Sequence, residues 1–247
     1  MKRMLPRLAV LACLLCAPTM AETPAHGKVL VLNAAVSEPL SNDKQTGFVD
    51  RLVGIALQRL NYRLESVHIP AERALIIADD GISDGEMLRI AGLQKNYPNL
   101  IQVPEKLVDL EFVAFTRNKS LEITGWQDLA THSVAIITGW KIFEQNIPAT
   151  TELVTVKNVD QLFTLLSKDR ADVVLYSRWS GLAYIHKHQL QGISIVEPPL
   201  ARQSMYVYLY KRHRDLVPRL ADELHALKAE GEYQRLFQEI LAPYDGD

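Results

Sequence analysis

The sequence predicts an α/β protein made of two strand-and-helix units. Three observations carry this prediction. Apolar, β-branched runs alternate with amphipathic stretches, the alternation restarts after residue 118, and two helical stretches with no accompanying strand close the chain. Strands that alternate with helices are typical of parallel sheets with right-handed helical crossovers. Because the last helices have no sheet of their own, we expect them to return to the first unit.

The first unit is expected to contain three short strands and two helices before a longer strand. KVLVLN, from Lys28, is a buried-strand run. FVDRLVGIALQRL places apolar residues at helical spacing, with Thr46 as the expected cap. A second helix is expected to stop at Gly81. The strands are predicted at 28–33, 62–69, 86–90 and 108–118, and the helices at 48–60 and 71–81.

The second unit repeats this pattern. Strands are predicted at 133–138, 152–156, 172–177 and 193–197, with a helical turn at 125–130 and helices at 140–147, 159–170 and 179–189. A last strand at 204–211 precedes helices at 215–229 and 232–241, which are separated at Gly231. The chain passes between the units near 112–118 and 198–206, which predicts a hinge. Ligands of open α/β sheets lie beyond the carboxyl ends of the strands, so we expect the site in the gap between the units.

The N-terminus has the pattern of an export signal. MKRMLPR is basic, LAVLACLLCA is apolar, and APTMA ends in small residues at Ala21. The apolar run is about half the roughly 20 residues that a membrane-spanning helix needs. We therefore predict a cleaved signal peptide at residues 1–21 and export of the mature chain. An uncleaved anchor and a lipid-anchored Cys13 are the alternatives.

Cleavage would leave a cysteine-free, mildly acidic chain. Both cysteines, Cys13 and Cys16, lie in the signal. Removing Lys2, Arg3 and Arg7 leaves 24 basic residues against 29 acidic ones, so the formal charge falls from −2 to −5. An acidic exported protein is a poor candidate for binding nucleic acid. We expect a monomer with no cofactor and no metal, since no ligand motif occurs and His186 and His188 point in different directions on a helix.

At this level the sequence resembles the bacterial periplasmic solute-binding proteins of family 3, the amino-acid-binding type. The resemblance runs from about Lys28 to Tyr244. Its segments are TGFVDRLVGIALQRL, PAERALIIADDGISDG, WQDLATHSVAIITG, LLSKDRADVVLYS and LADELHALKAEGEYQRLFQEI. It implies a two-lobed, hinge-closing type II fold, with lobe 1 at 27–114 and 203–247 and lobe 2 at 115–202. It also implies a small polar ligand in the cleft and a membrane transporter as partner.

The residues that hold α-amino acids in this family are not found at the matching places. The carboxylate-binding arginine would fall near 96–97, where there is none. The ammonium-binding aspartate is replaced by Ser177, and the aromatic that covers the ligand is replaced around Ser37 and Glu38. A zwitterionic amino acid in the usual pose is therefore not expected.

Three arginines are the candidate ligand-binding cations. Arg89 ends a predicted strand, Arg73 starts the helix after the second strand, and Arg178 follows the strand at 172–177. If they converge on the cleft, they favour a carboxylate, sulfonate or phosphate. The alternative is that each is an ordinary surface or structural charge.

Gly139, Trp140 and Lys141 open a helix after another predicted strand. Free N–H groups at a helix start bind anions, Trp140 offers a stacking surface, and Lys141 adds charge. Packing in the core is an equal alternative for Trp140. Glu38 is a candidate for meeting a cationic group of the ligand, and the alternative is a solvated loop residue.

These residues predict a periplasmic protein that captures a small polar, anionic or carboxylate-bearing solute and presents it to a membrane permease. Two alternatives stay open. The first is an enzyme on the same scaffold, similar to cyclohexadienyl dehydratases, with Glu38 or Glu86 as general acid. The second is a ligand-binding partner of a sensory receptor.

Overall fold

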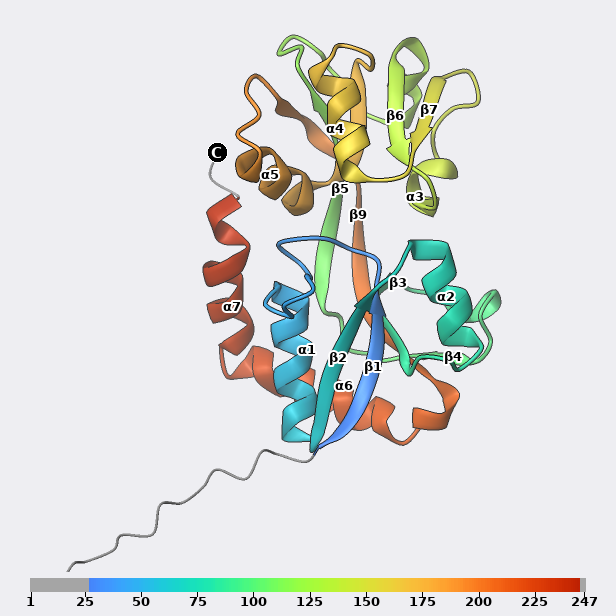
Figure 1. Ribbon diagram of the computed structural model, residues 1–247, viewed down its shortest axis with the longest axis vertical. Helices are drawn as coiled ribbons and strands as arrows, with labels where there is room; N and C mark the ends of the chain where they lie inside the picture. Colours follow the sequence, from blue (N-terminus) through green and yellow to red (C-terminus); the bar gives the residue numbers. More distant parts are fainter. Residues whose placement is uncertain (1–26, 245–247) are drawn as a thin grey trace, which may run out of the picture.

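The computed structural model describes residues 27–244, so the predicted signal peptide lies outside the described residues. The chain forms two lobes, one above the other, with strands β5 and β9 running between them (Figure 1). This confirms the two-lobed α/β fold. No helix within residues 27–244 is long and apolar enough to cross a membrane.

Lobe 1 is built on a parallel core of three strands in the order β2-β1-β3. Its elements are β1 (Lys28–Ala34), α1 (Phe48–Arg59), β2 (Tyr62–His68), α2 (Ala71–Asp79), β3 (Gly85–Ile90) and the short β4 (Leu100–Gln102). Five of these match predicted elements, and β4 was not predicted. Helix α1 begins one residue after Gly47, not at a Thr46 cap, and the Asp50 carboxylate accepts the Gly47 N–H at 3.2 Å. A Cβ at Gly47 would lie 2.4 Å from the Leu40 carbonyl oxygen, so only glycine fits there.

Lobe 2 repeats the alternation of strand and helix. It contains β6 (Ser133–Ile137), α3 (Lys141–Glu144), β7 (Glu152–Val156), α4 (Val159–Ser167), β8 (Val173–Ser177) and α5 (Arg178–Lys187). Strand β6 pairs in parallel with β7 and β8. The predicted helix at 140–147 is a single turn, and the predicted turn at 125–130 is the 3-10 helix Trp126–Thr131.

The two lobes share one sheet, because β5 (Val108–Thr116) and β9 (Ser194–Tyr210) pass through both. The predicted strands at 193–197 and 204–211 are therefore parts of a single strand. The antiparallel β5–β9 ladder is interrupted where Phe112 faces Ala201 and Ala114 faces Val196. The extra residues on β9 include Pro198 and Pro199, which have no N–H to donate to a ladder. This interruption overlaps the two passages near 112–118 and 198–206 where a hinge is predicted.

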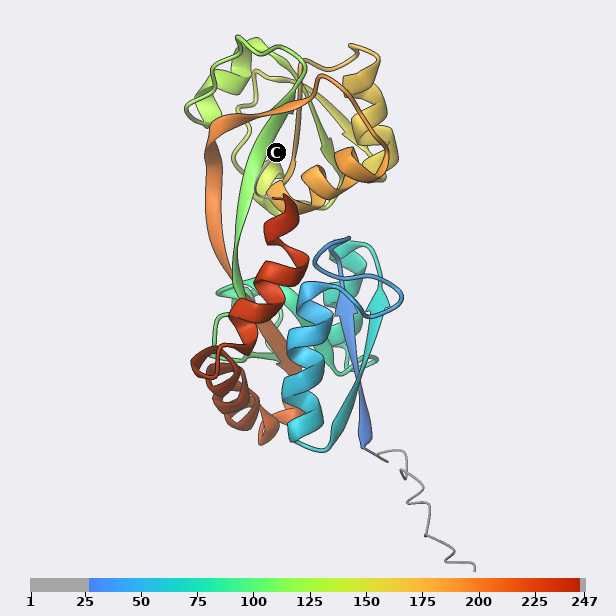
Figure 2. The same ribbon diagram turned by 90° about the vertical axis from the view of Figure 1, so that its left-hand side faces the viewer.

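The C-terminal helices α6 (Leu216–Ala229) and α7 (Glu232–Ile240) pack on α1 of lobe 1. Helix α7 then runs along the molecule toward lobe 2 (Figure 2). The ring of its Phe237 meets that of Trp179 of α5 edge-on, with 5.8 Å between ring centres. The rings of Tyr244 and His186 are likewise edge-on, with 6.2 Å between their centres. The end of the chain therefore touches both lobes.

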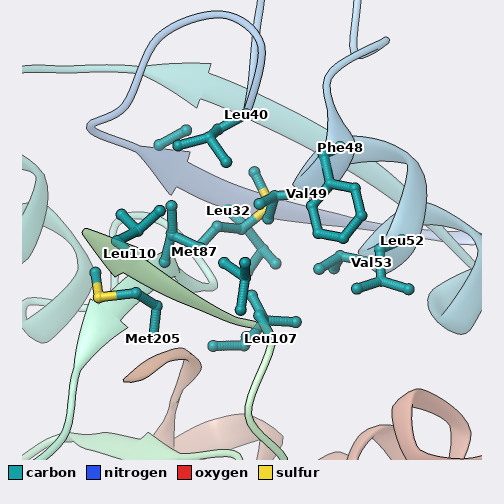
Figure 3. Close-up of a cluster of buried hydrophobic side chains, with 14 of the residues drawn as sticks. Leu32, Leu40, Phe48, Val49, Leu52, Val53, Met87, Leu107, Leu110 and Met205 are labelled. Atoms are coloured by element: carbon teal, nitrogen blue, oxygen red, sulfur yellow. The ribbon is translucent and has the colours of Figure 1, made fainter. Parts of the chain in front are cut away.

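The core of lobe 1 lies between the sheet and α1. Leu32 and Met87 of neighbouring strands pack with Phe48, Leu52 and Val53 of α1 (Figure 3). Leu110 and Met205 extend this core along β5 and β9 toward the hinge. The floor of the gap between the lobes is thus continuous with a packed interior.

Candidate functional site

A pocket of about 350 Å³ lies between the lobes, with walls from both. Lobe 1 contributes α2 and the end of β3, lobe 2 contributes the start of α3, and the hinge strands provide the floor. The lining residues are Ala35, Val36, Ala71, Glu72, Leu75, Leu88, Arg89, Ile90, Ala91, Gly92, Leu93, Asn96, Tyr97, Leu110, Phe112, Gly139, Trp140, Lys141, Ile142, Gln145 and Met205. We call this space the interlobe pocket.

Arg89 faces this pocket because β3 contains a bulge. The pairing with β9 shifts between Glu86 and Arg89, and Leu88 takes a left-handed conformation with φ of 63°. Side chains alternate along a strand, so residues three apart point to opposite faces unless an extra residue intervenes. The bulge therefore brings Arg89 to the same side as Glu86.

The Arg89 guanidinium is held by lobe 1 itself. Its Nε donates to Glu86 at 2.8 Å and its Nη2 donates to the Ala71 carbonyl at 2.9 Å. Glu86 has no exposed side-chain surface, and Asn33 donates to it at 3.4 Å. Burial raises the pKa of Glu86, and the charge and hydrogen bond of Arg89 oppose that rise. Arg89 is thus a fixed cation whose charge is largely balanced by a buried carboxylate.

Trp140 is held in place by aromatic rings of lobe 2 and of the hinge strand β5. Measured between ring centres, it stacks on Phe143 at 5.6 Å, lies 4.8 Å from Tyr176, and meets Phe112 edge-on at 6.1 Å. The Trp140 ring packs against the core and also lines the pocket, and its stacking on a ligand stays a prediction.

Lys141 reaches across the gap from lobe 2. Its Nζ donates to Glu144 at 3.0 Å and lies 3.8 Å from the Glu72 carboxylate of α2. The hydrogen bond and charge of Glu144 raise the pKa of Lys141, so the ammonium is charged at neutral pH. Gly139 has φ of 90°, and its N–H donates to the same Glu144 at 2.6 Å, so this N–H is not free for an anion.

Four of the predicted site residues, namely Arg89, Gly139, Trp140 and Lys141, meet at the interlobe pocket. The other four do not line it. Arg73 is exposed on α2, where its neighbour Glu72 faces the pocket. Ser177 is buried before α5, and its hydroxyl has no hydrogen-bond partner within the described residues.

Arg178 and Glu38 lie elsewhere. Arg178 donates to Glu111 of β5 at 2.5 Å and to Glu197 of β9 at 2.6 Å, so it ties α5 to both hinge strands. Glu38 accepts from Lys187 of α5 at 2.9 Å beside a separate pocket of about 440 Å³. The predicted convergence of three arginines is thus wrong. Of the three, only Arg89 lines the pocket, because Arg73 is exposed on α2 and Arg178 is paired with Glu111 and Glu197.

Sequence reasoning missed the apolar walls and Glu72. Leu88, Ile90, Leu110 and Phe112 line the pocket, and the sequence analysis placed them in strands without assigning them to a site. The feature that could have indicated Glu72 is its position beside Arg73 at the start of α2. The first turn of this helix faces lobe 2. A contact between lobes depends on tertiary geometry, which the sequence of one helix does not contain.

Other contacts also cross the gap. The Ser37 and Tyr176 hydroxyls lie 3.0 Å apart, and the Ser180 hydroxyl lies 3.5 Å from the Ser37 carbonyl. Together with the pairs Glu72–Lys141 and Glu38–Lys187, they join the loop after β1 and helix α2 to lobe 2. The arrangement described here is therefore a closed one.

The comparison with known protein families found no matching family model. A protein from Shewanella oneidensis, described as uncharacterized, is 30% identical over 202 residues, which cover 77% of this chain and 74% of that protein.

The chain belongs to the same family as this Shewanella protein.

Solved structures agree in fold. The substrate-binding protein of an amino acid ABC transporter has a TM-score of 0.70 at 18% identity, covering 85% of this chain and 98% of that chain. A histidine kinase sensor domain with similarity to periplasmic binding proteins has a TM-score of 0.73 at 16% identity, covering 87% and 98%. The GluR0 ligand-binding core in complex with L-glutamate has a TM-score of 0.76 at 12% identity, covering 87% and 99%. The predicted resemblance to family 3 solute-binding proteins is confirmed in its fold.

Proposed function

We propose that this protein is a periplasmic solute-binding protein that captures a small carboxylate-bearing solute between its two lobes. The observation that carries the proposal is the interlobe pocket, whose walls come from α2 and β3 of lobe 1 and from α3 of lobe 2. A solute that touches both walls does so only when the lobes are closed. It therefore favours the closed form by its differential affinity for that form.

The anionic group of the solute would be held by Lys141 and Arg89. Lys141 sits on lobe 2 and Arg89 on lobe 1, so a carboxylate between them would bridge the gap. The Glu72 carboxylate is only 3.8 Å from Lys141 and stands where such a solute oxygen would bind. Glu72 would then yield its place to the solute, since its side chain is 61% exposed and can turn to water.

The partner proposed for the closed form is a membrane protein, either a permease or a sensory receptor. The compared structures support both, since one is named for an amino acid transporter and another for a histidine kinase. The sequence pattern of an export signal supports a periplasmic location.

The positions of the two candidate acids favour binding over catalysis. A dehydratase needs a carboxyl group free to give a proton to the substrate. Glu86 is fully buried behind Arg89, and Glu38 is paired with Lys187 outside the interlobe pocket. Absence of turnover with prephenate and arogenate is the expected result for the purified protein.

The experiment is a thermal-shift screen of acidic, basic and neutral solutes, followed by small-angle scattering with each hit. Acidic solutes are expected to raise the melting temperature by mass action, and to reduce the radius of gyration by favouring the closed form. A screen in which no solute of any class stabilises the protein contradicts the proposed function.

A further inference from the structure

We propose that the solute joins an apolar body, aromatic or branched aliphatic, to a single carboxylate. This inference rests on the proposed function and names its substrate class. It follows from the combination of an apolar wall, a fixed indole ring and a nearly balanced set of charges in the interlobe pocket.

The first step is the apolar character of the lining. On the lobe 1 side the pocket is lined by Val36, Leu75, Leu88, Ile90 and Leu93, on the floor by Leu110, Phe112 and Met205, and on the lobe 2 side by Trp140 and Ile142. The polar side chains of the lining are those of Glu72, Arg89, Asn96, Tyr97, Lys141 and Gln145. A polyhydroxylated solute would leave hydroxyl groups against the apolar wall, and burying such groups unpaired is costly. An apolar body gains by removing the same surfaces from water.

The second step is the rigidity of the indole wall. Trp140 is stacked at 3° on Phe143 and lies 37° from the plane of Tyr176. Its position is set by Phe143 of α3 and Tyr176 of β8 in lobe 2 and by Phe112 of the hinge strand β5. A flat or branched apolar group would meet a surface that needs no reordering, and this lowers the entropic cost of binding.

The third step is the count of charges around the pocket. Arg89 is paired with Glu86, and Lys141 is paired with Glu144 and Glu72. Of these carboxylates, only Glu72 comes from the opposite lobe and lines the pocket. One solute carboxylate can replace Glu72 and keep the balance, whereas a second would lie among the acids without a partner. Dicarboxylates are therefore disfavoured.

This arrangement makes Glu72 and Lys141 a pair with opposite effects on specificity. Lys141 attracts the solute carboxylate, and Glu72 competes with it for the same ammonium. Replacing Lys141 should weaken the binding of a carboxylate probe, and replacing Glu72 should strengthen that binding. A neutral probe of the same shape should respond little to either change.

The test uses phenylacetate and 4-methylpentanoate as probes, with phenylacetamide as the neutral isostere and succinate and glucose as polar comparators. Titration calorimetry on the purified protein gives the Kd of each. We expect phenylacetate to bind best among the aromatic and polar probes. Lys141→Met should raise the Kd of phenylacetate about tenfold, and Glu72→Gln should lower that Kd about threefold. Both changes are in the range expected for a partly exposed charged hydrogen bond.

The matched control is the other lysine–glutamate pair that joins the lobes. Lys187→Met and Glu38→Gln alter the same kind of interlobe contact outside the interlobe pocket. If the control pair changes the Kd of phenylacetate as strongly as the Lys141 and Glu72 variants do, the effect belongs to lobe closure, and the assignment of the carboxylate to Lys141 is overturned.

Tryptophan fluorescence reports the apolar body independently. Trp140→Phe should remove the fluorescence change caused by phenylacetate, and Trp126→Phe, whose ring lies outside the pocket, should retain it. Tighter binding of succinate or glucose than of phenylacetate would overturn the substrate class and leave solute binding intact. If no probe and no solute of the wider screen binds, the proposed function itself fails.

Discussion

The ion pair between Glu86 and Arg89 makes a strong prediction about stability. Glu86 has no exposed side-chain surface, and Arg89 keeps 13%. Removing one partner of a buried pair costs about 3–5 kcal/mol, because the other charge stays buried without compensation. Since Arg89 is slightly exposed, we expect Arg89→Met to lower the free energy of unfolding by about 3 kcal/mol at pH 8.

The cost should depend on pH in a defined direction. Burial raises the pKa of Glu86, so the folded protein holds this proton more tightly than the unfolded chain. The corresponding stabilisation is complete below the ordinary glutamate pKa and is lost as the pH rises through the folded value. Without Arg89 that folded pKa rises further. The cost of Arg89→Met should thus be smaller at pH 5 than at pH 8.

Urea unfolding followed by circular dichroism at both pH values measures this. The double variant Glu86→Met with Arg89→Met is the control, since it removes both charges and should recover part of the stability lost at pH 8. A cost that is equal at the two pH values, together with no recovery in the double variant, would refute the assignment of a charged, buried pair. The same double variant is also the proper background for ligand studies. In Arg89→Ala alone, the Glu86 carboxylate would stay buried without its partner, and the protein would be destabilised.

Three further predictions concern backbone fit, capping and lobe closure. Gly85→Ala should destabilise by about 2 kcal/mol or more in thermal unfolding, since the new Cβ would lie 2.1 Å from the Tyr208 carbonyl oxygen. Asp50→Ala should cost about 1–2 kcal/mol in urea unfolding, because this buried carboxylate accepts two backbone N–H groups and a serine hydroxyl at the start of α1; an unchanged midpoint would contradict it. Tyr176→Phe should increase the radius of gyration of the ligand-free protein by scattering, since it removes the 3.0 Å contact with Ser37 across the gap.

The sequence predicted the elements that depend on local pattern. Strand β1 and helix α1 followed from a β-branched run and from helical spacing, and Gly231 separated the last two helices as expected. The continuity of β9 was missed, because Pro198 and Pro199 indicate an interruption and do lie where the ladder is broken, yet the strand resumes beyond them.

The sequence indicated part of the candidate site, but it did not indicate which carboxylates pair with the arginines. Arg89, Trp140 and Lys141 follow strand ends in the sequence and line the interlobe pocket, and their contact with a solute stays a prediction. The partners of the arginines were not predictable, since Arg178 meets Glu111 and Glu197 only when α5 packs on the hinge. Likewise, the bulge that turns Arg89 toward Glu86 puts a leucine in a left-handed conformation, and no sequence rule favours leucine there.

The facing residues Phe112 and Ala201 have a consequence for how this chain can be cut and rejoined. Residues 113–200 are joined covalently to lobe 1 through these two neighbours on antiparallel strands. Antiparallel neighbours can be joined by a tight turn of two residues. The distal half is thus an insert with adjacent ends, so a short hairpin loop could stand in for it without moving the ends of the strands that remain.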